Sequence, residues 1–279
     1  MAATAGASFH LQSFFVNRLR LSFRAQHRVR FPSGKAGNVL RGALGAIAPE
    51  WIAARARTGP SGMRNRPRPF VLRAAHLDGK SIAAGEPFHF EVNLFDRRDS
   101  VAAAIADAFA EIARQGLGVG RGQAELISSA CDRLVLDLRP KMIPIEKVLI
   151  RFVTPTELKD ENSLATRPGF GILFARVRDR IGALSTFYGD GPPEIDFKGI
   201  GERASRVRMT RCDVREVEIH RRSSRTGQVH PIGGFVGEAE YEGALAEFVP
   251  FLEAARFTGV GRQTVWGKGQ IEVGVVSPA

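Results

Sequence analysis

Two glycine-rich connections constrain the fold of this chain more strongly than any other feature of its sequence. Residues 259–269 contain four glycines and two cations, and they join a helical pattern to the strand-like run 270–276. A shorter copy at residues 116–122 also lies between a helical pattern and a strand. Glycine reaches positive φ angles and lets another backbone approach closely. The recurrence predicts that the chain is built from two similar halves.

Hydrophobic periodicity predicts the same order of elements in both halves: strand, helix, strand, strand, helix, strand. The first half has predicted strands near 17–31, 70–76, 88–95 and from 123, and predicted helices near 37–47 and 100–114. The second half has predicted strands near 146–153, 206–220, 233–241 and from 270, and predicted helices near 170–187 and 243–256. This order is that of the ferredoxin-like, split βαβ unit. We therefore predict an α+β fold of two tandem ferredoxin-like (RRM-like, βαββαβ) domains with antiparallel sheets, residues 1–142 and 143–279.

Proline and glycine mark two features of the second half. Residues 189–205 contain Gly-Pro-Pro at 191–193 and are predicted to form a loop. Pro250 falls inside the last helical pattern, where the missing N–H is expected to kink or split the helix.

The first predicted strand separates apolar and basic residues by parity. Its apolar residues occupy odd positions and its arginines occupy even positions: Leu19, Leu21, Phe23, Ala25, Val29 and Phe31 against Arg18, Arg20, Arg24, Arg28 and Arg30. A period of two indicates a strand with one core face and one basic face. His27 has the apolar parity, so we expect it to pack in the core, although a bulge before the helix would turn it toward a groove.

The charge balance indicates a polyanionic partner. The formal net charge is +11 and the sequence pI is near 10.5, values typical of nucleic-acid-binding proteins.

No acidic residue precedes Glu50, a composition that transit peptides share, but the period-two pattern of the first strand argues against a transit peptide. Cys131 and Cys212 form no CxxC motif, so we expect neither a zinc site nor a disulfide, and a reducing cytoplasm fits. No apolar run is long enough to predict a membrane span.

Few residues show a pattern that carries chemistry. The turn 33–38 contains Lys35 and precedes a helix, so it is predicted either to bind an anion through its N–H groups or to be an ordinary turn capped by Asn38. No Ser/His/Asp pattern or acidic metal cluster is identifiable, so a nuclease would use a metal-independent route. In that route a base activates the RNA 2′-OH, an acid protonates the 5′-oxygen, and cations stabilise the transition state. The candidates are His27, Lys35 and Tyr188, whereas His76 and His89 have no distinguishing context.

Several segments together resemble a known family. Residues 37–45, 222–228, 230–237 and 259–269 resemble the CRISPR RAMP superfamily, and most of all its endoribonucleases that process precursor crRNA. The resemblance implies tandem ferredoxin-like domains and metal-independent cleavage of CRISPR repeat RNA to a 2′,3′-cyclic phosphate and a 5′-hydroxyl. It also implies that RNA lies in the cleft between the domains, with the last glycine loop at its backbone.

The resemblance and the charge pattern together predict a set of RNA-binding residues. Its members are Arg24, Arg28, Arg41, Arg222, Arg225, His230, Gly259, Gly261, Arg262, Gly267, Lys268 and Gly269. We expect no metal ion and no cofactor. The family often has a histidine in or just after the first helix and another before the last glycine loop, but here residues 37–57 contain none and Thr258 occupies the second place. The alternative is therefore a non-catalytic RNA-binding subunit that assembles with other CRISPR effector subunits.

Overall fold

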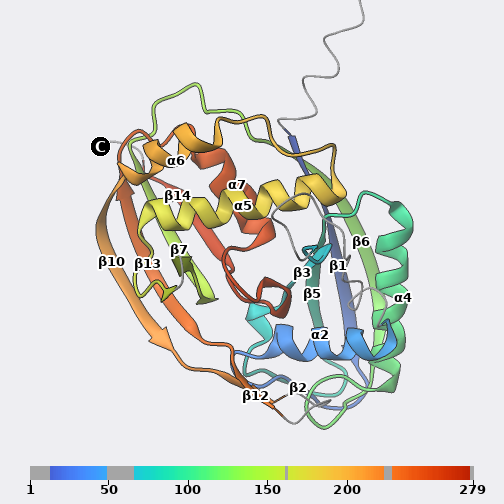
Figure 1. The fold of residues 1–279 in the computed structure, drawn as a ribbon. Coiled ribbons are helices and arrows are strands. Elements are labelled where there is room, and N and C mark those ends of the chain that lie inside the picture. Colours follow the sequence, from blue (N-terminus) through green and yellow to red (C-terminus); the bar gives the residue numbers. More distant parts are fainter. Residues whose placement is uncertain (1–12, 49–65, 161–162, 223–227, 277–279) are drawn as a thin grey trace, which may run out of the picture.

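Two four-stranded antiparallel sheets, one from each half of the chain, form the framework of the molecule (Figure 1). The computed structural model describes residues 13–48, 66–160, 163–222 and 228–276, apart from the side chains of residues 221, 222 and 230. The first half contains β1 (Ser13–Ala25), β2 (Val29–Arg30), α2 (Ala36–Ile47), β3 (Phe70–Arg73), η1 (Ala75–Leu77), β4 (Ser81–Ile82), β5 (Pro87–Leu94), α4 (Asp99–Gln115) and β6 (Ala124–Asp137). The second half contains β7 (Lys147–Thr156), β8 (Lys159–Asp160), β9 (Ser163–Leu164), α5 (Phe170–Tyr188), α6 (Phe197–Ser205), β10 (Arg208–Val217), β11 (His220–Arg222), β12 (Val229–Pro231), β13 (Gly234–Glu242), α7 (Val249–Thr258), η2 (Thr264–Trp266) and β14 (Ile271–Val275).

The two sheets have the same topology. Their strand orders are β3-β5-β1-β6 and β10-β13-β7-β14, so in each sheet the first and third strands of the unit lie in the middle. Every neighbouring pair is antiparallel. This arrangement confirms the predicted fold of tandem ferredoxin-like units. The predicted boundary after residue 142 falls in the connection between β6 and β7.

Alternate residues of β1 point to opposite faces of the first sheet, and each face packs against a different part of the molecule. Leu19, Leu21 and Phe23 are buried in a core that also contains residues of α2 and α4. Phe14 and Val16 point to the opposite face, where they join the core of the second half. The arginines further along β1 share this second face. The second half therefore covers one end of the open sheet face and leaves the arginine end uncovered.

The prediction that His27 packs in the core is wrong. β1 ends at Ala25, and the backbone N–H groups of Gln26 and His27 both donate to the carbonyl of Gln123, at 2.8 and 3.1 Å. The chain bends there, so the alternation of the strand stops and His27 is exposed.

Two predictions about the second half are also wrong. Residues 197–205, predicted as a loop, form α6, whose first turn is capped by the Asp196 side chain accepting from the N–H of Gly199 at 3.0 Å. Pro250 neither kinks nor splits a helix, because α7 begins at Val249 and Pro250 lies in its first turn. The N–H that proline lacks has no intrahelical partner at that position. No helix in the described part of the chain is long and apolar enough to cross a membrane.

Candidate functional site

The start of α2 is capped from a distant turn. The carboxylate of Asp78, which follows η1, accepts from the backbone N–H of Ala36 at 2.7 Å. Burial raises the pKa of Asp78, while this N–H and the nearby Lys268 act in the opposite direction. A protein carboxylate therefore accepts from the helix start, where the sequence predicted either an external anion or a cap by Asn38. Asn38 is not the cap either, because the helix begins at Ala36.

Lys268 faces the interior of the molecule. Its side chain belongs to a residue only 2% exposed, and its ammonium donates to the carbonyl of Gly34 at 3.1 Å, across 234 residues of sequence. Burial lowers the pKa of Lys268 to about 8, although Asp78 opposes the shift. The lysine thus joins the last glycine loop to the turn before α2. A phosphate contact by this lysine remains a prediction, and its burial makes that contact require a local opening.

The last glycine loop packs against α2 through backbone atoms. A Cβ added at Gly37 would lie 2.8 Å from the carbonyl oxygen of Trp266 and 3.0 Å from the Cα of Gly267. Gly267 itself has a φ of +79°, and the other glycines predicted to bind RNA also have positive φ angles: Gly259, Gly261 and Gly269. Gly267 faces Gly37 and Leu72 of the first half, whereas Gly259, Gly261 and Gly269 face backbone atoms of the second half, so the positive φ angles serve both the joint and the loop's own packing. Backbone contact between this loop and RNA remains a prediction.

The predicted RNA-binding arginines have different environments. The Arg41 guanidinium lies 5.4 Å from the centre of the Trp266 ring, and Arg262 forms an ion pair with Glu157. Arg24 and Arg28 are exposed, and neither has an ion pair among the described residues. Arg222 and His230 lie in the paired strands β11 and β12, but their side chains, and all of Arg225, fall outside the described residues.

The three predicted catalytic residues do not come together. Tyr188 lies near the start of β1, where its hydroxyl donates to the carbonyl of Pro67 at 2.5 Å and burial raises its pKa. His27 lies just beyond the other end of β1. Thirteen residues at about 3.3 Å each make that strand about 40 Å long. Lys35 lies at the start of α2, and among the described residues no hydrogen bond or ion pair joins it to His27 or Tyr188.

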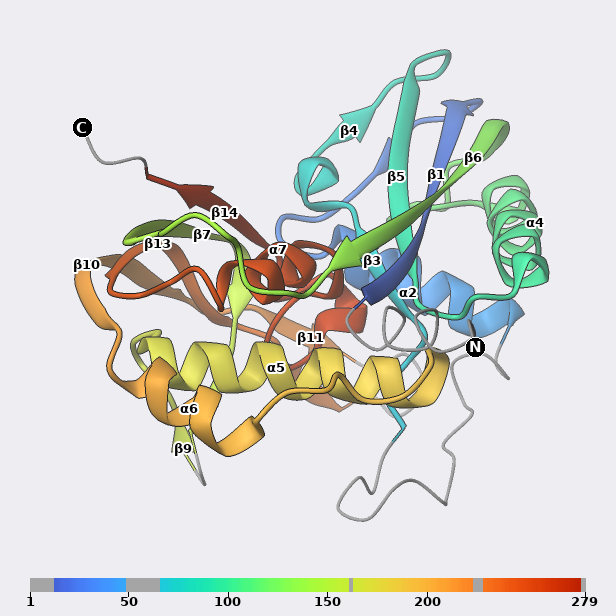
Figure 2. The ribbon, with the colours of Figure 1, turned by 90° about the horizontal axis from the view of Figure 1, so that it is seen from above.

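A cleft of about 630 Å³ lies between the two halves. Six of its lining residues come from β3, η1 and β5 or the turns beside them, namely Arg73, Ala75, His76, Asp78, His89 and Glu91. Three more come from β7, β14 and the residue before β14: Val153, Gln270 and Glu272. Seen from above, β7 and β14 lie on one side of this region and β3 and β5 on the other (Figure 2).

The cleft contains two histidines that sequence reasoning missed. The rings of His76 and His89 stack with their centres 4.7 Å apart, and the Nε2 of His76 lies 2.8 Å from the carbonyl oxygen of His89. The alternation Phe88, His89, Phe90 predicts the face of His89, since both phenylalanines are buried. No local pattern predicts His76, which belongs to the short η1 after β3.

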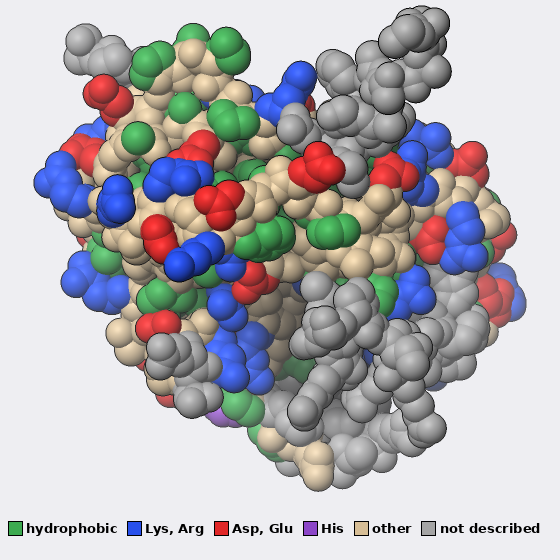
Figure 3. Space-filling view, turned by 45° about the horizontal axis from the view of Figure 1, so that its top comes forward, with side chains coloured by type: hydrophobic (Ala, Val, Ile, Leu, Met, Phe, Trp, Pro, Cys, Tyr) green, Lys and Arg blue, Asp and Glu red, His purple; other side chains and the backbone are tan. Residues whose placement is uncertain are grey.

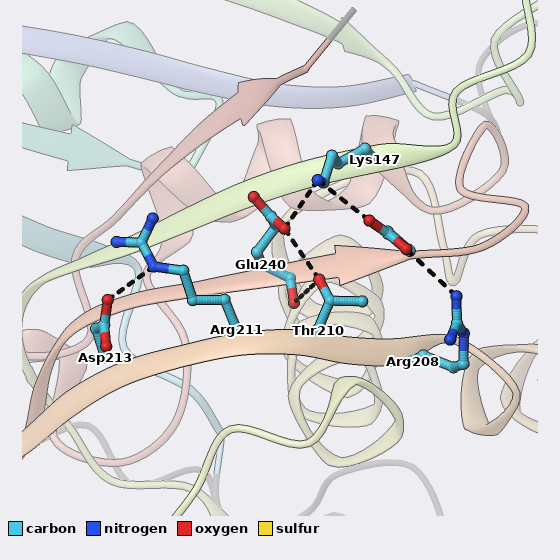
Figure 4. A network of polar contacts seen from close by, with 7 residues as sticks. Lys147, Arg208, Thr210, Arg211, Asp213 and Glu240 are labelled. Carbon is cyan, nitrogen blue, oxygen red and sulfur yellow. Dashed lines mark hydrogen bonds and ion pairs between the residues drawn. The ribbon is translucent and has the colours of Figure 1, made fainter. Parts of the chain in front are cut away.

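The second half presents a different kind of open sheet face. Lys147 bonds Glu240 and Glu242 at 2.9 and 3.1 Å, Arg208 also approaches Glu242, and Arg211 pairs with Asp213 (Figure 4). On the face of the molecule shown in Figure 3, basic and acidic side chains are likewise interspersed. The ion pairs on the sheet face of the second half neutralise much of its charge, so this face is not a simple basic surface for a polyanion.

Two family models match different parts of this chain. Residues 150–271 match the family model of the CRISPR-associated endoribonuclease Cas6, and residues 49–135 match a model described as an N-terminal domain. No curated protein matches the sequence.

Solved Cas6 structures share the fold over most of this chain. A product complex of Thermus thermophilus Cas6 is 17% identical, covers 92% of this chain and 98% of its own, and superimposes with a TM-score of 0.60. A second Cas6 product complex is 18% identical, covers 94% and 100%, and has a TM-score of 0.59. A partial Cas6-RT-Cas1–Cas2 complex is 11% identical, covers 97% of this chain and 47% of the other, and has a TM-score of 0.63.

Proposed function

We propose that this chain, whose residues 150–271 match the model of the CRISPR-associated endoribonuclease Cas6, binds CRISPR repeat RNA and cleaves it without a metal ion. The match to the Cas6 model is the observation that carries the proposal. The RNA 2′-OH attacks the adjacent phosphorus and the 5′-oxygen leaves, which produces a 2′,3′-cyclic phosphate and a 5′-hydroxyl. The basic composition supports RNA as the partner, and the cleft between the halves offers room for a nucleotide.

Uncompensated arginines suggest where the RNA enters. Arg24 on β1 and Arg28 and Arg30 beyond it are exposed, and the described residues include no ion pair to any of them. We propose that the RNA backbone follows these arginines toward the cleft, with the last glycine loop beside it. Lys35 stays our candidate for charge stabilisation, because it lies at the turn that Asp78 and Lys268 hold in place. His27 and Tyr188 lie at opposite ends of β1, so at most one of them can serve the same phosphate.

A non-catalytic RNA-binding subunit of a CRISPR ribonucleoprotein is the second candidate. It is favoured by the helix α2, which has no histidine, and by Thr258, which is fully buried with its hydroxyl bonded to the carbonyl of Gly259 at 2.9 Å. In that case the chain retains the processed RNA and contacts other effector subunits.

Cleavage of repeat RNA in EDTA distinguishes the two functions. We expect the chain to cut an all-ribose CRISPR repeat RNA in the presence of EDTA and to leave intact the same RNA with a 2′-deoxy sugar at the cut site. The deoxy RNA removes the nucleophile while preserving the backbone charge, so it also serves as the binding control. Tight binding of both RNAs without cleavage of either would exclude the enzyme and support the subunit.

A further inference from the structure

The two histidines of the interdomain cleft form a pair with defined proton positions. We call His76, His89 and the Arg73 floor beneath them the histidine cleft. A carbonyl oxygen only accepts hydrogen bonds, so the Nε2 of His76, 2.8 Å from the carbonyl of His89, must carry hydrogen. The Nδ1 of His76 therefore retains the lone pair when the ring is neutral. Both side chains are exposed, so a ligand in the cleft can reach them.

The electrostatic surroundings of His89 favour its neutral form. Burial, the charge of His76 and the charge of Arg20 all lower the pKa of His89, and Glu91 acts in the opposite direction. Rings stacked 4.7 Å apart do not both become cationic at low cost. The lowered pKa of His89 favours its neutral form, which can accept a proton, and two adjacent imidazoles can supply the base and the acid that general acid–base catalysis requires.

The floor of the histidine cleft carries a buried positive charge. Arg73 is only 8% exposed, and its Nη2 donates to the carbonyls of Arg256 and Phe257 at 2.7 and 3.0 Å. Its Nη1 is buried and has no hydrogen-bond partner among the described residues. Burial and the neighbouring Arg180 lower the pKa of Arg73 to about 9. A buried guanidinium is normally paired with an anion, and within the described residues no carboxylate lies within ion-pair distance of this one.

The carboxylates around the histidine cleft already have other partners. Glu91 pairs with Arg20 at 2.8 Å, Asp78 caps α2, and Glu272 lies 3.7 Å from Arg151. Groups other than Arg73 thus partly compensate the charges of these three carboxylates. The α7 carbonyls and the charge of Glu91 stabilise the Arg73 guanidinium. No carboxylate among the described residues forms an ion pair with it, so an anion in the cleft would offset its charge further.

We infer that the histidine cleft holds a phosphodiester of RNA and that His76 and His89 are the base and acid of its transesterification. The inference deepens the proposed function and rests on it. One imidazole removes the proton of the 2′-hydroxyl, and the 2′-oxygen forms a bond to phosphorus. The bond from phosphorus to the 5′-oxygen breaks, and the other imidazole donates its proton to that oxygen. Arg73 acts through its positive charge on the extra negative charge of the transition state.

Single-turnover cleavage of repeat RNA by histidine variants tests the assignment of the base and acid. We expect His76→Asn and His89→Asn each to slow cleavage by about 100-fold or more, the usual contribution of an acid or base. Binding of the 2′-deoxy RNA should change by less than about threefold, and the thermal melts should stay close to wild type. His27→Asn is the competing arm, since it removes an exposed histidine of the same half. Wild-type rates in both cleft variants, or loss of cleavage in His27→Asn alone, would overturn the inference.

A second readout does not depend on cleavage. Histidine C–H signals are followed by NMR during a pH titration with and without uridine 3′-monophosphate, and the two Asn variants assign the signals. A phosphate in the cleft should raise the pKa of both histidines, because an adjacent negative charge stabilises the imidazolium. Unmoved titrations at millimolar nucleotide would overturn the inference even if the protein cleaves RNA. If wild type leaves repeat RNA intact but the histidines respond, the proposed enzyme fails and the phosphate site stands.

Discussion

At the scale of single residues, two glycines allow the halves of this protein to touch through their backbones. Gly37 lies in the first turn of α2, and Gly267 lies in the last glycine loop with a φ of +79°. A methyl group on Gly37 would meet the Trp266 carbonyl at 2.8 Å, a contact with backbone rather than with a side chain that could move aside. The glycines therefore have a structural role whether or not RNA contacts the loop.

Gly37→Ala is expected to destabilise the protein. The helix gains about 0.5–1 kcal/mol from alanine, but the clash forces a backbone shift that costs about 1–3 kcal/mol. Gly42→Ala in the same helix is the matched control, because a Cβ there meets nothing within 4 Å. In urea unfolding we expect a lower midpoint for Gly37→Ala and a higher one for Gly42→Ala. Equal gains in both variants would show that the two halves do not rely on the close contact.

At the scale of elements, two helices have their ends completed by residues far away in sequence. α2 starts on the carboxylate of Asp78. α7 ends where Arg73 and Asn93 bond the carbonyl of Phe257, and where Arg180 bonds that of Thr258 at 2.8 Å. Free carbonyls at a helix C-terminus attract cations. Both ends lie beside the cleft, so the elements that line it depend on packing between the halves.

Asp78→Ala should weaken the start of α2. Loss of a side-chain cap typically costs about 1 kcal/mol, and the charged partner of Lys268 is lost as well. Asp78→Asn retains an oxygen that can accept from Ala36, so it is the matched comparison. We expect hydrogen exchange of the first α2 amides to accelerate in the alanine variant and to change less in the asparagine variant. Equal protection in both variants and wild type would rule out capping by Asp78.

At the scale of the whole molecule, much of the positive charge is already paired. Arg18 and Arg20 on β1 pair with Asp132 and Glu91, both at 2.8 Å. Beyond them the exposed arginines at the end of β1 and in β2 have no such partner in the described part of the chain. The net charge of +11 is thus most available to RNA at this end of the first half.

Arg28→Ala should reduce RNA affinity and its dependence on salt. Each phosphate contact on single-stranded nucleic acid contributes about 0.7 to the slope of log K against log salt. We expect filter binding to show a slope smaller by about that amount. Arg262→Ala should show a smaller change, because Arg262 is already paired with Glu157. Arg114→Ala is the control, since Arg114 pairs with Glu111 on α4, and an equal slope loss there would point to bulk charge alone.

Local sequence alone determined the main strands and helices of both units and their order, although it missed α6. Alternation in β1 and β5 and helical spacing in α2, α4 and α5 depend on neighbouring residues, so they were visible without the fold, and their order identified the ferredoxin-like unit twice. The sequence predicted the backbone conformation of the last glycine loop but not the contact that this loop makes with α2. Its positive φ angles follow from composition, but its contact with Gly37 does not.

The tertiary structure alone decided the candidate site. His76 and His89 meet because η1 folds beside β5, and Lys268 reaches Gly34 across 234 residues. His27 lies outside the core because β1 ends at Ala25, where the next two backbone N–H groups donate to the carbonyl of Gln123 from the other end of the unit. Each of these outcomes depends on a contact between residues distant in sequence. Local periodicity carries no information about such contacts, since they form only when the two sheets and their connections pack together.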